Sequence, residues 1–240
     1  AFYNCSSLRI IEVYDVEDEE KYFMTDSYGA LYSLVGGEID ELVFVPRATL
    51  TRFTILDGTK KIASYALYNC PNLTEVIIPA SVTKIGTSAF NSNYKLETVT
   101  FLPMADGSLG EGLTVGASFQ FCDEIEEITF PKRLVSLDKD VFKSSAGITS
   151  VKISTVDGVA DSVNYYDVNG VVCKQGVLVY APYGLTGEFT IPVGVTAVGK
   201  SAFEGLGITK LIVPGYVTLI DEQAFMNCRQ LTTIEFDTFA

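Results

Sequence analysis

The 240-residue sequence contains neither histidine nor tryptophan, and its 17 basic residues are outnumbered by 30 acidic ones. Without histidine the chain cannot form a Ser-His-Asp or Cys-His nucleophile, a histidine general base or a histidine-containing metal site. A formal net charge of -13 provides no basic surface for a nucleic-acid backbone or an anionic membrane. No apolar run approaches the ~18 residues of a membrane-spanning helix. We therefore expect no nucleic-acid partner and no membrane insertion. With the arguments given below on cysteines, carboxylates and the repeat, we also expect no metal or other cofactor and no catalytic residues.

The residues that are present predict a folded chain. Hydrophobic residues make up 48% of the sequence, which is enough to bury a large core. The first residues lack the basic and apolar regions of a signal peptide. Because residue 1 falls inside a repeat, we expect a mature or excised fragment of a longer protein.

An internal repeat dominates the sequence. Each copy approximates A-F-x-x-C-x-x-L-x-x-I-x-I-P, followed by V-x-x-I-G before the next A-F pair. Its marker position, usually phenylalanine, recurs at steps of 23, 29, 23 and 22 residues, at Leu67, Phe90, Phe119, Phe142, and again at Phe203 and Phe225. This spacing lies within the range of leucine-rich repeats. We predict one domain over residues 1–240, with repeats near 1–13, 53–79, 80–103, 113–131, 132–153, 189–214 and 215–236.

The repeat has a physical interpretation. Alternating apolar residues in L-x-x-I-x-I predict a short strand with one buried face. The following proline cannot donate a ladder hydrogen bond and ends the strand. Gly86 and Gly199 are predicted to lie at a tight bend before the A-F turn. One unit cannot bury its own apolar face, so several must stack to form a continuous core.

The sequence also contains a longer internal repeat, and each of its two copies interrupts the short repeat with an insertion. Residues 1 to about 90 are repeated at about 141 to 225, with Leu42–Pro46 matching Leu178–Pro182. Each copy contains an irregular insertion, at 14–52 and 154–188. We predict that both insertions form β-hairpins or long turns within the stack.

The repeat and the G-x-[LV]-[YC] and L-V-[YF]-x-P elements of the insertions resemble the BspA-like leucine-rich repeat family of bacterial surface proteins. The resemblance implies a leucine-rich-repeat solenoid, α/β or mainly β, that is curved and right-handed with a parallel sheet on its concave face. It also implies an extracellular or cell-surface protein that adheres to host or bacterial macromolecules. The family supplies no catalytic residues.

The five cysteines have two interpretations. Four lie three residues after the marker position, at Cys5, Cys70, Cys122 and Cys228, where Asn93, Ser145 and Leu206 replace cysteine in other copies. Their spacing does not bring four ligands together for zinc, so we favour a small buried position in the stack over disulfides or metal. Cys173 lies off this register and is the one candidate for an exposed or intermolecular thiol.

Carboxylates concentrate in the first insertion. Residues 1–46 carry ten acidic and two basic side chains, a net of -8 out of -13. The run Asp15, Glu17, Asp18, Glu19 and Glu20, followed by Glu38, Asp40 and Glu41, has the ligand type of a calcium site but not the spacing of an EF-hand. A solvated acidic loop is the favoured interpretation.

Two surfaces are candidates for binding. The outward positions of the strand motif define a concave face, at Glu75, Ile77, Thr98, Thr100, Glu127, Thr129, Lys152 and Lys210. It has few of the Tyr, Trp and Arg side chains that dominate binding energy. Eight of the thirteen tyrosines lie in the insertions instead, at Tyr14, Tyr22, Tyr28, Tyr32, Tyr165, Tyr166, Tyr180 and Tyr183. They form either a recognition surface or the aromatic packing that seats each insertion on the stack.

The leading hypothesis is a non-enzymatic module that binds an extracellular protein or glycan. One alternative is a structural spacer that projects another domain. The other is a carbohydrate-active enzyme with paired carboxylates such as Glu75 and Glu127, which the intervening Thr98 disfavours. Homodimerisation through a terminal repeat is a further expectation, because end coils can expose apolar edges.

Overall fold

The computed structural model describes residues 2, 5, 8–14, 20–46, 50–108, 110–154 and 165–237. They form two compact units, one from residues 1–124 and 133–143, the other from 125–132 and 144–240. We describe each unit separately. Every regular element in the described ranges is a β-strand, and most strands pair in parallel between successive coils. The predicted leucine-rich-repeat solenoid is thus confirmed in its mainly β form.

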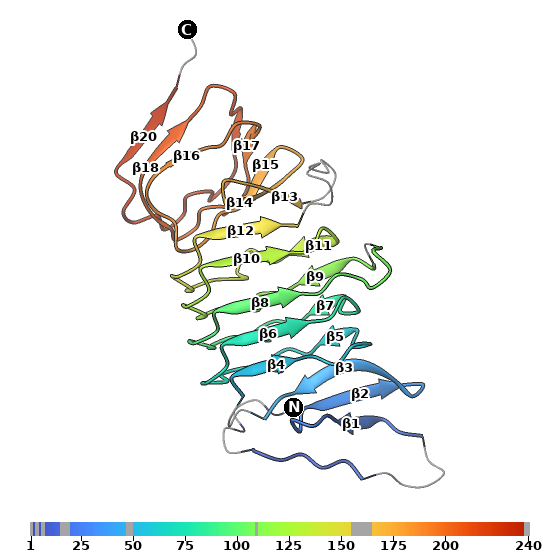
Figure 1. Cartoon of the computed structure of the whole chain (residues 1–240). Coiled ribbons are helices and arrows are strands. Elements are labelled where there is room, and N and C mark those ends of the chain that lie inside the picture. The colour runs from blue at the N-terminus through green and yellow to red at the C-terminus, as the bar shows by residue number, and fades with distance from the viewer. Residues whose placement is uncertain are drawn as a thin grey trace. The chain divides into compact units, whose positions relative to one another are not determined.

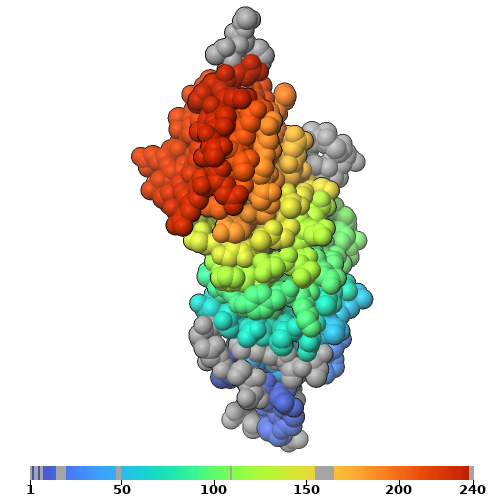
Figure 2. All heavy atoms as spheres, turned by 90° about the vertical axis from the view of Figure 1, so that its left-hand side faces the viewer, coloured from blue at the N-terminus to red at the C-terminus, as the bar shows by residue number. Residues whose placement is uncertain are grey.

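The first unit contains two sheets (Figure 1). Strands β4, β6 and β8 form a parallel sheet, and the second sheet has the order β1-β2-β3-β5-β7-β9-β11. Successive coils appear as adjacent bands in sequence order in the space-filling view (Figure 2). The strands are β1 Phe23–Thr25, β2 Leu31–Val35, β3 Glu38–Phe44, β4 Arg52–Thr54, β5 Lys61–Ile62, β6 Glu75–Ile78, β7 Lys84–Ile85, β8 Thr98–Phe101, β9 Leu113–Val115 and β11 Leu134–Leu137.

The second unit contains three sheets: β10-β12, β16-β18-β20 and β13-β14-β15-β17-β19. Its core includes buried residues of β14, β15 and β18. The strands are β10 Glu127–Phe130, β12 Ser150–Ile153, β13 Tyr165–Val168, β14 Val171–Lys174, β15 Val177–Tyr180, β16 Thr186–Thr190, β17 Ala197–Val198, β18 Gly207–Val213, β19 Leu219–Ile220 and β20 Thr233–Phe236.

Most coils contribute two strands, whereas the sequence predicted only one in each. The L-x-x-I-x-I motif forms the predicted strand: in the coil of β6, Leu73, Val76 and Ile78 are fully buried. The V-x-x-I-G motif forms a second short strand, because Val82 and Ile85 also point into the core. These two inward residues hold the segment between them against the core. The segment can then pair with the same segment of the next coil, as β5 pairs with β7.

Both insertions are antiparallel meanders, which confirms the predicted hairpins. Strands β1–β3 and β13–β15 each pair antiparallel, and the last strand of each meander joins the second strand of the next coil in parallel. The central turns correspond: Gly36–Gly37 and Gln175–Gly176 all have positive φ. That backbone suits two-residue hairpins with the twist of the flanking strands.

The glycine of V-x-x-I-G permits close contact between coils. A Cβ on Gly86 would lie 2.5 Å from the Ser64 backbone nitrogen, and one on Gly199 would lie 3.0 Å from the Leu178 oxygen. Gly86 N also donates to Ile62 O of the preceding coil at 2.9 Å. A side chain at Gly86 would separate the two coils, so the motif requires glycine for reasons of space.

Left-handed backbone recurs around the marker aromatic. The residue two positions before it has positive φ at Tyr65, Ser88, Ser201 and Gln223, and the residue two positions after it does so at Asn69, Ser92, Phe121, Ser144, Gly205 and Asn227. For residues with a Cβ this conformation costs roughly 1–2 kcal/mol. Only Gly205 meets the requirement without steric cost.

This pattern predicts opposite effects for two changes in one turn. Ser201→Gly should stabilise the protein by about 0.5–1 kcal/mol, because relief of the left-handed strain exceeds the added chain entropy. Gly205→Ala should destabilise it by about 1–2 kcal/mol, because alanine enters the strained conformation at φ 77°. Urea unfolding of both variants measures the difference. Equal shifts in the same direction would contradict the assignment.

Candidate functional site

The marker aromatics form a buried column in the first unit. The rings of Phe90 and Phe119 are stacked with centroids 4.8 Å apart and an interplanar angle of 1°, and Phe119 stacks on Phe142 at 5.5 Å. All three side chains are fully buried. The column aligns successive turns and so determines which side chains of those turns reach the surface.

The repeat cysteine position supplies a hydrogen-bond donor to the preceding coil. Cys122 Sγ donates to Phe90 O at 3.2 Å, and Cys228 Sγ donates to Phe203 O at 2.8 Å. Asn93, which replaces cysteine, donates from Nδ2 to Leu67 O at 3.0 Å. Cysteine and asparagine therefore share one role, the satisfaction of a marker-residue carbonyl, which the sequence interpretation as a small apolar position missed.

The cysteines differ in exposure. Cys70 and Cys122 are buried, Cys228 is half-buried and Cys5 is exposed. Burial raises the pKa of Cys122 to about 12, so its thiol stays protonated and can act as that donor. All five are free.

The expectation for Cys173 is wrong. It lies in β14 with its side chain fully buried in the core of the second unit. Burial raises the pKa of its thiol to about 12. An exposed or intermolecular role is excluded for this residue, because its strand position points inward like that of Leu34 in the first meander.

The tyrosines of the first insertion divide into two groups. Tyr14, Tyr22 and Tyr28 are 80%, 61% and 50% exposed, whereas Tyr32 is fully buried. Tyr32 Oη accepts from Leu56 N at 3.4 Å and lies 3.4 Å from Asp26 Oδ2, and burial raises its pKa. Tyr32 is thus a core residue and is removed from the candidate contact set.

The tyrosines of the second insertion mostly seat it on its unit. Tyr180 is buried, so its assignment to a contact surface is corrected. Tyr166 and Tyr183 pack against the core, and Tyr166 Oη accepts from Gly176 N at 3.2 Å. Tyr165 is half-buried and lies under Lys174, whose Nζ is 4.8 Å from the ring centroid. Packing therefore explains much of the aromatic content of this insertion.

The residues of the predicted concave face lie on three sheets. Glu75, Ile77, Thr98 and Thr100 occupy β6 and β8 of the first unit; Glu127, Thr129 and Lys152 occupy β10 and β12 of the second, and Lys210 lies in β18. Equivalent positions of neighbouring coils are ladder partners, with Glu75 opposite Thr98 and Thr129 opposite Lys152.

Ion pairs occupy the charged positions of these sheets. Glu75 pairs with Arg52 at 3.3 Å, Glu127 with Lys152 at 2.8 Å, and Lys210 with Glu188 and Glu235 at 3.5 and 3.1 Å. Lys152 holds the pKa of Glu127 below its ordinary value. A glycosidase general acid needs a raised pKa, so Glu127 is in the wrong environment for that role.

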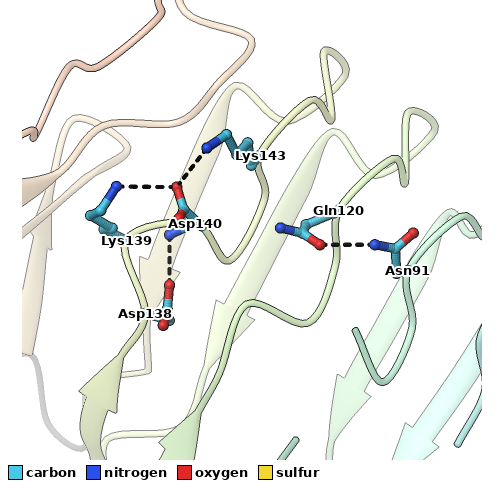
Figure 3. Close-up of polar contacts among 6 residues, drawn as sticks. All are labelled: Asn91, Gln120, Asp138, Lys139, Asp140 and Lys143. Atoms are coloured by element: carbon cyan, nitrogen blue, oxygen red, sulfur yellow. Dashed lines mark hydrogen bonds and ion pairs between the residues drawn. The ribbon is translucent and has the colours of Figure 1, made fainter. Parts of the chain in front are cut away.

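The turn side of the first unit carries a polar ladder (Figure 3). Asn91 Nδ2 donates to Gln120 Oε1 at 2.8 Å, one position after the marker aromatic in each coil. Near the next turn, Asp140 Oδ1 lies between Lys139 and Lys143 at 3.3 and 3.4 Å. These contacts join polar groups of the protein to one another, as expected of a structural surface.

The acidic insertion is described only in part, because Asp15, Glu17, Asp18 and Glu19 lie outside the described residues. Glu20 Oε2 accepts from Tyr22 Oη at 3.3 Å, and Asp40 pairs with Lys61 at 3.0 Å. Across the described part of the chain, no three His, Cys, Asp or Glu side chains are grouped to hold a metal ion. Nor do the described residues include a helix long and apolar enough to cross a membrane.

The last coil exposes apolar side chains. Ile234 and Phe236 are 45% and 65% exposed, although the equivalent Leu211 and Val213 of the preceding coil are buried. Leu219 is likewise 56% exposed. Dimerisation through a terminal repeat stays a prediction.

Sequence reasoning missed two exposed apolar residues near the tyrosines. Phe23 in β1 is 47% exposed and Val35 at the end of β2 is 67% exposed. Phe23 directly follows Tyr22, so the signal was an aromatic pair inside an acidic insertion. Below, the term aromatic surface denotes the exposed side chains of five residues of the first insertion: Tyr14, Tyr22, Phe23, Tyr28 and Val35.

The stacked coils, buried aromatic column and inter-coil hydrogen bonds define a leucine-rich-repeat protein with a β-solenoid fold. The model of the BspA type leucine rich repeat region matches residues 37–167 and 183–239 in six copies. The chain belongs to this family, as the resemblance in its repeats implied. No functionally curated protein matches the sequence.

Solved structures of similar fold come from bacteria. The pneumococcal vaccine antigen PcpA is 18% identical, with a TM-score of 0.60 over 89% of this chain and 69% of that one. A leucine-rich repeat protein from Eubacterium ventriosum ATCC 27560 is 19% identical, with a TM-score of 0.50 over 89% of this chain and 71% of that one. At these identities the similarity establishes the fold.

Proposed function

We propose that this chain is a non-catalytic binding module of a bacterial surface, and that the aromatic surface contacts an extracellular protein or glycan. The observation that carries the proposal is the exposure of Tyr14, Tyr22 and Tyr28, each at least half accessible to solvent. Tyrosine offers a large amphipathic contact area at a small cost in side-chain entropy. Exposed aromatic side chains on an insertion of a repeat protein are typical of recognition surfaces.

Family membership supports a surface or secreted location. The match to the BspA type repeat and the vaccine antigen among the structural neighbours both favour a protein that meets other cells or their matrix. The net charge of -13 agrees with a soluble, monodisperse extracellular domain. Adhesion is the function that best accounts for both a surface location and exposed aromatic side chains.

The two alternatives have weaker support. A spacer has no use for exposed aromatics, which raise the risk of aggregation. A carbohydrate-active enzyme needs a general acid beside a second carboxylate, whereas Glu75 and Glu127 lie in different sheets and are each paired with a basic side chain. A binding measurement separates the first alternative from the proposal.

The proposed contact predicts a specific loss of binding. The chain is first screened on an array of extracellular-matrix proteins and bacterial polysaccharides. For any partner found, the double variant Tyr14→Ser, Tyr22→Ser should bind at least about tenfold more weakly, as loss of interface tyrosines commonly costs more than ~1 kcal/mol each. The Tyr14 and Tyr22 hydroxyls donate to Glu12 and Glu20, both at the surface, so stability should be unchanged.

Tyr94→Ser provides the matched control. Tyr94 is 53% exposed in the same unit but lies outside the insertion. It should bind like the unmodified chain. Equal weakening by both variants would reject the aromatic surface, and an array with no bound partner would favour the spacer.

A further inference from the structure

Strand β1 is an edge strand of the first unit among the residues that the structure describes. It is the end strand of the seven-stranded sheet and pairs on one side with β2. Among the described residues, no backbone group pairs with its other side. A free edge presents unpaired N–H and C=O groups that can accept another strand.

The register identifies the free backbone groups. Leu34 N donates to Tyr22 O at 2.8 Å and Asp26 N donates to Ala30 O at 3.1 Å, so residues 22, 24 and 26 direct their hydrogen-bonding groups toward β2. Antiparallel ladders alternate along a strand. The N–H and C=O groups of Phe23 and Thr25 therefore point away from β2.

Natural edge strands are usually protected by charge, proline or a bulge. The β1 sequence Phe-Met-Thr has none of these, and Phe23 is 47% exposed. The corresponding strand of the second meander is tied to its unit, because Asp167 in β13 accepts from Ile153 N of β12 at 2.7 Å. Within the described residues, the first meander thus differs from its internal copy in that its first strand has no partner on its outer side.

The surroundings of β1 are acidic. Residues 20–46 contain five acidic side chains and one basic side chain. Asp40 is paired with Lys61, whereas Glu38 and Glu41 form no ion pair with any described residue. Glu41 lies opposite Ser33, which in turn lies opposite Phe23, so this carboxylate is two strands from the free edge.

We propose that the β1 edge binds a basic, extended peptide segment by β-strand addition. The free groups of Phe23 and Thr25 would supply the backbone pairing, and the exposed rings would cover apolar side chains of the partner. Glu38 and Glu41 would attract its basic side chains and make the affinity salt-dependent. The inference rests on the proposed binding function and selects a protein segment over a glycan as partner.

The test uses the full chain and three fluorescent ten-residue peptides. The first alternates lysine and valine, the second replaces every lysine with glutamate, and the third is the lysine peptide with N-methyl groups on alternate backbone nitrogens. Fluorescence polarisation should show saturable binding of the first peptide only. The third keeps the charge but cannot pair along the strand, so it separates strand addition from attraction to an acidic protein.

Thr25→Pro removes one outward N–H group and should weaken binding of the lysine-valine peptide about tenfold or more. Proline is tolerated on strand edges, and the unmodified group has no described partner. Thr25→Val keeps the N–H group and should bind normally. Absence of binding by the first peptide, equal binding of the N-methylated peptide, or full affinity in folded Thr25→Pro would overturn the inference.

The two proposals fail in different ways. If an array partner binds through Tyr14 and Tyr22 and Thr25→Pro leaves that binding intact, strand addition is wrong and the binding function stands. If the peptides bind but no array partner is found, the edge is functional and the adhesion proposal is rejected. If Thr25→Pro does not fold, the comparison of the first and third peptides still decides the result.

Discussion

Phe119→Ala should lower the free energy of unfolding by about 3–5 kcal/mol, the range for removal of a buried aromatic ring. Phe119 is fully buried and stacks on Phe90 on one side and Phe142 on the other. In a repeat protein stability is roughly a sum of coil and interface contributions. One substitution therefore removes ring contacts from two interfaces as well as creating a cavity.

The same turn supplies the control. Phe121 has the same side chain two positions later but is 43% exposed and makes none of these stacks. Phe121→Ala should cost less than about 1 kcal/mol, since surface substitutions usually have small effects. Urea unfolding followed by far-ultraviolet circular dichroism measures both. Similar losses for the two variants would show that the aromatic column does not hold the coils together.

Asn93→Leu should cost about 2–4 kcal/mol, although leucine fills the same position in another coil at Leu206. Asn93 is fully buried, and it both accepts from Cys70 N at 2.7 Å and donates to Leu67 O at 3.0 Å. Leucine can do neither. Leaving a buried backbone group without its partner costs about 1–3 kcal/mol each.

Asn93→Cys distinguishes hydrogen bonding from volume. A thiol can donate to Leu67 O as Cys122 does to Phe90 O, so this variant should recover part of the loss. We expect its unfolding free energy to lie between those of the unmodified chain and Asn93→Leu. If Asn93→Leu is as stable as the unmodified chain, the position is only a small buried site.

The surface of the molecule was harder to predict than its core. The longer internal repeat already placed Tyr180 at the position of Phe44, and both are buried. Tyr32 in β2 of the first meander is also fully buried. The prediction of a contact surface rested on the number of tyrosines in each insertion. Their exposure depends instead on which face of each meander packs against the coils.

The second strand of the coils was likewise not predicted from the sequence. A two-residue strand such as Lys84–Ile85 carries no alternation by itself. It exists because stacking places Ile85 next to Ile62 at hydrogen-bonding distance. Pairing between coils is a tertiary event, so a pattern within one coil could not reveal it.

By itself the sequence determined the repeat, its inward residues, the two insertions and the solenoid class. These follow from periodic burial, which is local to each coil and visible as apolar spacing. Only the tertiary structure decided that the cysteine position is a hydrogen-bond donor, that Cys173 is buried, and that β1 is the end strand of its sheet. Each of these depends on which atoms a neighbouring strand or coil brings near, and distant segments meet only when the chain is folded.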